Sequence, residues 1–152
     1  MSINTELHQH HFRNERQKAM VNILFTYGWL MERLKNIVSD EGITLQQYNI
    51  LRILRGSNPE PLSTLQIRER MIDKMSDTSR LVDRLLTKKL VRKVICKEDR
   101  RLVDVTITDK GLKLLKRLDS RADEMDSVVG NLTEKESTSL SKLLDKIRVS
   151  NN

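Results

Sequence analysis

The sequence has one cysteine, few aromatic residues and no long apolar run, and each shortage excludes something. A single cysteine cannot form an internal disulfide, which is typical of proteins in a reducing cytoplasm. Aromatic residues make up only 3%, whereas leucine, isoleucine and valine are plentiful, so we expect a core of packed helices. The most apolar stretch, residues 20–31, is interrupted by Asn22 and Thr26 and is too short to cross a membrane. Residues 1–13 lack the apolar region of a signal peptide, so a cytoplasmic protein is expected.

Signals for enzymatic chemistry are also missing. We find no nucleophile–base pair, no glycine-rich phosphate loop and no paired-carboxylate motif, so we predict neither an enzyme nor a cofactor. His8, His10 and His11 lie near the amino terminus without a matching cluster of cysteines or carboxylates, and we predict no metal site. Cys96 lies among cations, but a packed or surface thiol is favoured over a redox sensor.

Positive charge is concentrated in one part of the chain. The 152 residues contain 28 Lys and Arg against 21 Asp and Glu, a net charge of +7. Residues 84–101 hold eight cations and only two anions, so they carry nearly all of this excess. A solvated charged face is the ordinary alternative, but clustered positive charge is typical of proteins that bind a polyanion.

The cationic stretch belongs to a predicted helix followed by a β-hairpin. Residues 76–88 have helical periodicity, with an apolar side and a side of small polar and cationic residues. Strands are predicted over residues 90–96 and 102–107, joined by a charged turn. A polar-faced helix beside a cationic two-stranded wing is typical of a winged helix-turn-helix, which binds double-stranded DNA.

Three capping boxes predict the starts of other helices. Each has a hydroxyl residue followed three positions later by Glu or Gln: Thr44 with Gln47, Ser63 with Gln66, and Thr133 with Glu136. A helix at about 64–71 and the helix at 76–88 then form the helix-turn-helix. A long helix is expected from Thr108 to Gly130, and residues 1–12 are expected to form a loose arm.

The first long helix is predicted to be apolar on two sides. One stripe runs over residues 20–38, and a second is formed by Val21, Phe25 and Trp29. Another subunit, a ligand or the chain's own core could cover the second stripe. The terminal helices have apolar faces with no partner left in the chain, so we predict a homodimer. Two-fold symmetry would place its recognition helices about 34–36 Å apart.

The order and spacing of these features resemble the MarR family of bacterial winged-helix regulators. The residues that carry the resemblance are Ser79-Arg80-Leu81-Val82-Asp83-Arg84-Leu85, Leu90-Val91, Asp99-Arg100-Arg101 and Ile107-Thr108-Asp109-Lys110-Gly111. The similarity covers about residues 15–148 and is strongest over 62–115.

The resemblance implies a single domain that is mainly α with a small β-hairpin. Dimerisation helices at about 1–40 and 108–150 would flank a winged helix-turn-helix lobe at about 44–107. Many relatives bind a small, often anionic or phenolic, effector between the dimerisation helices and the lobe. Phe25 and Trp29 are the residues predicted to line such a pocket.

The residues predicted to bind DNA lie on the helix and on the wing. Ser76, Ser79 and Arg80 are expected to read bases in the major groove, and the cations Arg84, Lys97, Arg100 and Arg101 to hold phosphates or the minor groove. The resemblance implies that Asp99 braces Arg101 and leaves Arg100 free to enter an A·T-rich minor groove. Asp83 is expected to orient Arg80 or Arg84 at helical spacing.

Lys89 departs from the family pattern, which usually has glycine before the first wing strand. Glycine suits the left-handed conformation at a helix end, where lysine costs about 1 kcal/mol. The helix at 76–88 could therefore end one residue differently.

The predicted function is a sequence-specific transcriptional regulator, a repressor rather than an activator. It binds a near-palindromic operator as a homodimer, with release by a small-molecule effector as an option. Two alternatives stay open: a non-specific architectural DNA-binding protein, and a winged-helix protein-interaction module that docks on an acidic partner.

Overall fold

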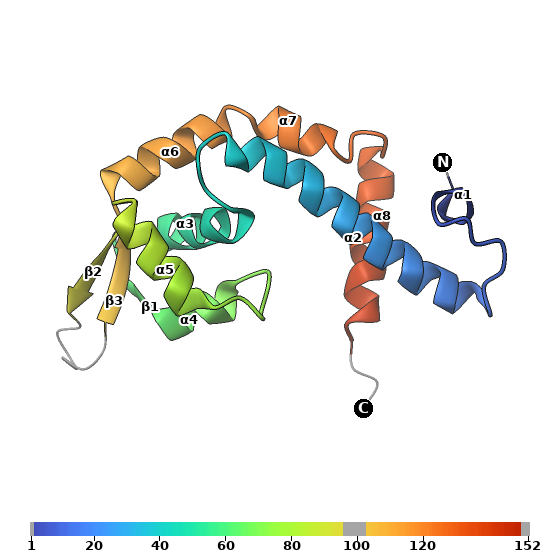
Figure 1. The fold of residues 1–152 in the computed structure, drawn as a ribbon, viewed down its shortest axis with the longest axis horizontal. Helices are drawn as coiled ribbons and strands as arrows, with labels where there is room; N and C mark the ends of the chain where they lie inside the picture. The colour runs from blue at the N-terminus through green and yellow to red at the C-terminus, as the bar shows by residue number, and fades with distance from the viewer. Residues whose placement is uncertain (1, 96–102, 150–152) are drawn as a thin grey trace.

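The computed structural model describes residues 2–95 and 103–149. Along the chain the elements are α1 (Ile3–Glu6), α2 (Glu15–Ser39), α3 (Leu45–Ser57), β1 (Leu62–Ser63), α4 (Thr64–Arg70), α5 (Thr78–Thr87), β2 (Val91–Ile95), β3 (Val103–Ile107), α6 (Asp109–Asp119), α7 (Ala122–Ser127) and α8 (Glu134–Ile147). The chain is mainly helical with one small sheet, as the sequence predicted. Figure 1 shows α3 to α6 and the sheet gathered at one end of the long helix α2, with α8 crossing α2 further along.

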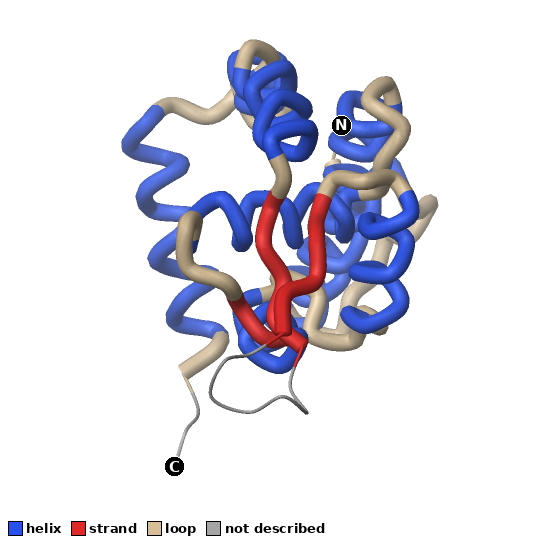
Figure 2. Tube along the Cα trace, turned by 90° about the vertical axis from the view of Figure 1, so that its left-hand side faces the viewer, coloured by secondary structure: helices blue, strands red, loops and turns tan. Residues whose placement is uncertain are grey.

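The sheet is antiparallel, with the strand order β1-β3-β2. β3 pairs with β2 so that Val91 lies opposite Ile107, and β1 pairs with β3 so that Leu62 lies opposite Val105. Figure 2 shows these strands in red among the helices. The sequence predicted β2 and β3 but missed β1, because two residues directly before a helix cap show no alternation.

The apolar core lies beneath the sheet and α3 to α6. We call residues 44–107, which contain α3 to α5 and the sheet, the winged-helix lobe. Its fully buried side chains come from all layers of the lobe and from α6: Ile50, Leu51, Leu54, Ile67, Met71, Val82, Leu85, Val105, Leu115 and Leu118. From α2 only Ile37 and Val38 are buried, while α7 and α8 bury nothing.

All three predicted capping boxes are formed. At the start of α3, the Thr44 hydroxyl accepts from the Gln47 N–H, and the Gln47 side chain accepts from the Thr44 N–H. The same reciprocal pair is present at the starts of α4 and α8. These bonds satisfy backbone donors that the first turn of a helix leaves free.

Two segments differ from the sequence-based prediction. The single helix expected between Thr108 and Gly130 is broken into α6 and α7 at Ser120 and Arg121. The Ser120 hydroxyl donates to the Arg117 carbonyl, and the Arg121 side chain donates to the Ile37 carbonyl of α2 and to Asp40 directly after it. The expected loose arm contains the short helix α1, whose Ile3 is buried.

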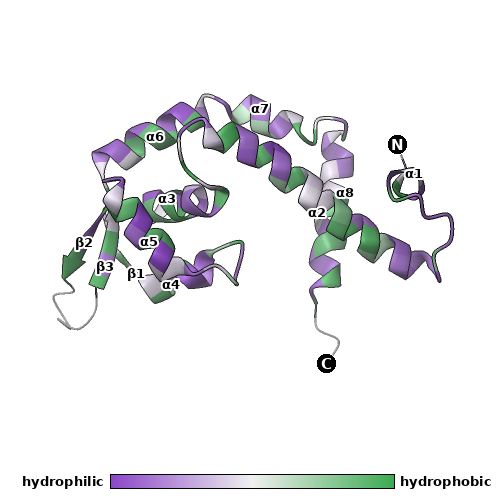
Figure 3. Cartoon of the chain, in the orientation of Figure 1, coloured by the Kyte–Doolittle hydropathy of each residue, from purple (hydrophilic) through white to green (hydrophobic). Residues whose placement is uncertain are grey.

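The outer halves of the terminal helices carry exposed apolar side chains. In α2 these are Met20, Ile23, Leu24 and Tyr27, and in α8 they are Leu140, Leu143 and Ile147. Figure 3 shows the apolar stretches of α2 and α8 in green. None of the helices in the described ranges is long and apolar enough to span a membrane.

Candidate DNA-binding surface

Helix α5 turns one side into the core and the other toward solvent. Val82 and Leu85 are fully buried, whereas Ser79, Arg80 and Arg84 are exposed. Within the described part of the chain, neither the Arg80 nor the Arg84 guanidinium has a hydrogen-bond partner. The helical periodicity therefore correctly predicted which side chains α5 presents, and forked cations with a small hydroxyl are suited to base edges and phosphates.

The start of α5 differs from the predicted one. Asp77 is the N-cap, and its carboxylate accepts from the Arg80 N–H at 3.1 Å. Ser76 therefore lies in the turn before the helix and not on its outer face, and its hydroxyl is buried without a partner in the described residues. The prediction that Ser76 reads bases from the helix is thus wrong about its position. The sequence contained the signal, because Asp at an N-cap is as favourable as Ser.

The turn between α4 and α5 is anchored to α3. The Ile72 N–H donates to the Asn49 side-chain oxygen at 2.8 Å, and the Met75 N–H donates to the Asp73 carboxylate at 3.0 Å. The first bond anchors the turn to α3, which belongs to the core, and the second stabilises the turn itself.

Asp83 contacts the wing and does not orient an arginine of its own helix. Its carboxylate accepts from the Lys93 ammonium of β2 at 3.0 Å, and both side chains are about half exposed or more. The prediction that Asp83 orients Arg80 or Arg84 is corrected accordingly, because a cation from the neighbouring strand takes the carboxylate. The ion pair joins the recognition helix to the base of the wing.

Helix α5 ends in a left-handed turn at Lys89. Its φ is +59°, its N–H donates to the Leu86 carbonyl, and the Leu90 N–H donates to the Leu85 carbonyl at 3.0 Å. These two bonds form a Schellman motif, which satisfies carbonyls at the helix end. The backbone therefore has the conformation that suits the family's glycine, although lysine occupies the position.

The N-cap of α6 is hydrogen-bonded to the end of α5. The Thr108 hydroxyl donates to the Lys89 carbonyl at 2.8 Å and accepts from the Gly111 N–H at 3.1 Å. A β-carbon at Gly111 would clash with the Leu90 carbonyl oxygen and lie 2.7 Å from Cγ1 of Ile107. A glycine is thus needed where α6 passes the base of the wing.

The predicted wing-tip residues Lys97, Asp99, Arg100 and Arg101 lie outside the described residues, as does Cys96. Their proposed roles stay predictions. The described base of the wing presents Arg92 and Lys93 as exposed cations next to α5.

A largely apolar cavity of about 340 Å³ lies between α2, α3 and α7. Its walls include Met31 and Leu34 of α2, Tyr48 and Arg52 of α3, and Met125 of α7. Phe25 and Trp29, the predicted effector-pocket residues, lie instead against α1, where they line a smaller cavity of about 290 Å³ with Ile3 and Glu6. The Arg33 guanidinium stacks over the Trp29 ring at 3.8 Å. No local pattern in α2 shows which of its two apolar stripes faces the lobe.

The fold and this surface define a class of protein. A helix-turn-helix with an exposed, cationic second helix and a strand pair beside it is a winged-helix DNA-binding lobe. Within residues 2–95 and 103–149, no three histidine, cysteine or carboxylate side chains gather in a way that could hold a metal ion.

Comparisons with known proteins identify the family. The sequence model of the MarR family matches residues 43–103, which form the winged-helix lobe. The HTH-type transcriptional regulator TcaR of Staphylococcus aureus is 30% identical over 117 residues, which cover 75% of this chain and 76% of TcaR. This chain belongs to the MarR family, whose members are DNA-binding transcriptional regulators and not enzymes.

Solved structures agree with this assignment. A MarR transcription factor from Planctomyces limnophilus is 35% identical, with a TM-score of 0.67 over 89% of this chain and 98% of that one. A MarR mutant from E. coli, crystallised in complex with operator DNA, has a TM-score of 0.81 over 91% of this chain and 99% of that one. Its identity is 21%, so that likeness concerns the fold alone.

Proposed function

We propose that this protein is a repressor that binds a near-palindromic operator as a homodimer. The observation that carries the proposal is the outer face of α5, where Ser79, Arg80 and Arg84 are exposed beside the cations of β2. In the E. coli relative of the same fold, the bound ligand is operator DNA. Here Ser79 and Arg80 read bases, while Arg84 and the wing cations Lys97, Arg100 and Arg101 hold phosphates or the minor groove.

The terminal helices support the homodimer. Leu24 in α2 and Ile147 in α8 are 65% and 63% exposed, and their neighbours at helical spacing are exposed and apolar as well. A regulator of this size does not normally leave two such faces in water. Burying them against a second copy removes the apolar surface and pairs the two winged-helix lobes, so that each occupies one half-site.

An effector is accommodated by the cavity between α2, α3 and α7. Its walls come from the terminal helices and from the winged-helix lobe, so a ligand there binds differently when the two parts move relative to each other. The apolar walls suit an apolar or aromatic ring, and the Arg52 guanidinium suits an anionic substituent. The bound repressor excludes polymerase from the promoter, and the effector releases the repressor from the DNA.

A selection of bound fragments from a random DNA pool tests the function. Enrichment of a near-palindrome whose half-sites lie about 10 base pairs apart is expected. The Arg80→Ala variant should then lose about 1–3 kcal/mol of discrimination at one base of the half-site. The matched control is Lys113→Ala, an exposed cation of α6 outside the proposed DNA-binding and dimer surfaces, which should bind as the wild type does.

The alternatives predict other outcomes. Tight binding with a steep salt dependence but no enriched sequence would show an architectural DNA-binding protein. An equal loss on every sequence for Arg80→Ala would count against base reading. Absence of binding to duplex DNA at low salt would leave a protein-interaction module.

A further inference from the structure

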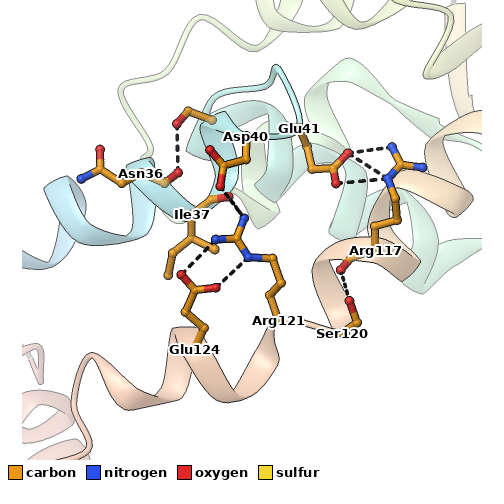
Figure 4. A network of polar contacts seen from close by, with 9 residues as sticks. Asn36, Ile37, Asp40, Glu41, Arg117, Ser120, Arg121 and Glu124 are labelled. Atoms are coloured by element: carbon orange, nitrogen blue, oxygen red, sulfur yellow. Dashed lines mark hydrogen bonds and ion pairs between the residues drawn. The ribbon is translucent and has the colours of Figure 1, made fainter.

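Two short connectors join the winged-helix lobe and α6, whose Leu115 and Leu118 belong to the core of the lobe, to the helices α2, α7 and α8. One follows α2 and contains Asp40 and Glu41, and the other separates α6 from α7 at Ser120 and Arg121. Figure 4 shows that the two connectors lie side by side and that arginine side chains cross from one to the other. Any change in the angle between the lobe and the terminal helices must bend both.

Arg121 ties the α6–α7 connector to the end of α2. Its Nη1 donates to the Ile37 carbonyl oxygen and to Asp40 Oδ2, each at 2.8 Å. Its Nε and Nη2 donate to the two carboxylate oxygens of Glu124 at 2.7 and 2.9 Å. The side chain is only 28% exposed, so water screens these bonds less than those of a free surface pair.

Arg117 of α6 makes a second tie, which reaches the connector after α2. Its guanidinium donates from Nε and Nη2 to the Glu41 carboxylate, the shortest distance being 2.7 Å. These hydrogen bonds lower the pKa of Glu41, as those from Arg121 lower the pKa of Glu124. Both carboxylates are therefore charged and bound at neutral pH.

Apolar packing at this junction comes from a few side chains, among them Val38 of α2 and the half-buried Met125 of α7, which pack on the core. From α2 only Ile37 and Val38 are buried, and α7 buries no residue. The hydrophobic effect is non-directional, whereas a bidentate arginine–carboxylate bond fixes an angle. Arg117 and Arg121 therefore add directional bonds at the place where the lobe meets the terminal helices.

We propose that Arg121, supported by Arg117, is a positioning residue that sets the half-site spacing accepted by the dimer. The proposal rests on the proposed function, since it needs a dimer on a two-part operator. Each added base pair moves the half-sites apart by about 3.4 Å and turns them by about 35°. We call the bonds of Arg117 and Arg121 the clamp; they hold the lobe in one orientation, so a changed spacing lowers the affinity for DNA. Without the clamp the lobes follow the changed spacing. They must then be ordered on binding, which lowers the affinity for the selected spacing.

The experiment measures affinities for the selected operator, for versions with one base pair inserted or removed at its centre, and for a single half-site. The full-length wild type is compared with Arg121→Met, which keeps the apolar stem without the donors. The control is Arg55→Met, which breaks the pair with Asp119 between α3 and α6 and leaves the connectors unchanged. For Arg121→Met we expect a loss of roughly fivefold or more on the selected spacing. We also expect a flatter dependence on spacing and unchanged half-site binding. Arg55→Met should match the wild type.

Other results overturn the proposal. An unchanged spacing profile in Arg121→Met with a normal wild-type profile refutes the clamp alone, whereas a wild type indifferent to spacing refutes the dimeric operator-binding function as well. An equal loss on operator and half-site shows a merely structural residue. Asp40→Ala guards against misfolding, because the Asp40 side chain is 66% exposed and its replacement by alanine removes only one bond of Arg121. It should flatten the profile in part, and an unchanged profile again refutes the clamp.

Discussion

Lys89 has a backbone conformation that lysine adopts at a cost. With φ at +59° it is the left-handed residue of the Schellman motif that ends α5. Glycine carries no β-carbon penalty there, so Lys89→Gly should raise the free energy of unfolding by about 1 kcal/mol. Urea-induced unfolding measures it. Lys89→Ala is the matched control, since it removes the same charge and keeps the penalty; equal effects of the two substitutions would attribute the gain to charge.

Gly111 is needed for a different reason, the close approach of α6 to the wing. A β-carbon there would lie 2.7 Å from Ile107 Cγ1 and would clash with the Leu90 carbonyl oxygen. Gly111→Ala should therefore lower the free energy of unfolding by about 1–3 kcal/mol, the usual cost of overpacking. Gly56 in α3 has open space around it, so Gly56→Ala should instead raise the free energy by up to about 1 kcal/mol. Thermal or urea unfolding of both variants would contradict this account if the two shifts had the same sign.

At the scale of elements, the ion pair between Asp83 and Lys93 links α5 to β2. Because Asp83 is the acid on the outer face of α5, Lys93 masks a negative charge that would repel phosphate. Lys93→Gln should weaken operator binding, by about fivefold at most for an exposed pair. Asp83→Asn combined with Lys93→Gln should restore most of the loss.

A cycle of operator affinities for the wild type, both single variants and the double variant checks this prediction. A double variant as weak as Lys93→Gln alone would show that Lys93 instead binds a phosphate directly. In that case the slope of the logarithm of affinity against the logarithm of salt concentration would also decrease by about one for Lys93→Gln.

Local patterns predicted most elements, and tertiary contacts account for those they missed. The capping boxes at Thr44, Ser63 and Thr133 depend only on residues three positions apart, so the sequence reveals them. The break at Arg121 depends on Ile37 and Asp40, more than 80 positions away, and no local pattern shows it. The same holds for the candidate site. Helical periodicity predicted that Arg80 and Arg84 are exposed, but it could not show that the partner of Asp83 comes from a strand.

At the scale of the whole molecule, the apolar faces of α2 and α8 lead to a prediction about assembly. Leu143 of α8 is 59% exposed, so a carboxylate there costs little in a single chain and much in a buried dimer interface. Leu143→Glu should therefore be a folded monomer of 17.8 kDa at micromolar concentration, whereas we expect the wild type to sediment as a dimer. Leu65→Glu is the control for mass, because Leu65 is 63% exposed but lies on α4 in the winged-helix lobe.

The same variant separates dimerisation from DNA contact. Leu143→Glu leaves the α5 surface intact, so its affinity for a single half-site should equal that of the wild type, while its affinity for the full operator falls toward the half-site value. This follows because two linked lobes bind the second half-site at high effective concentration and two free chains do not. A wild type that sediments as a monomer, or a Leu143→Glu protein that stays dimeric, would place the interface elsewhere and leave the exposed faces of α2 and α8 without this role.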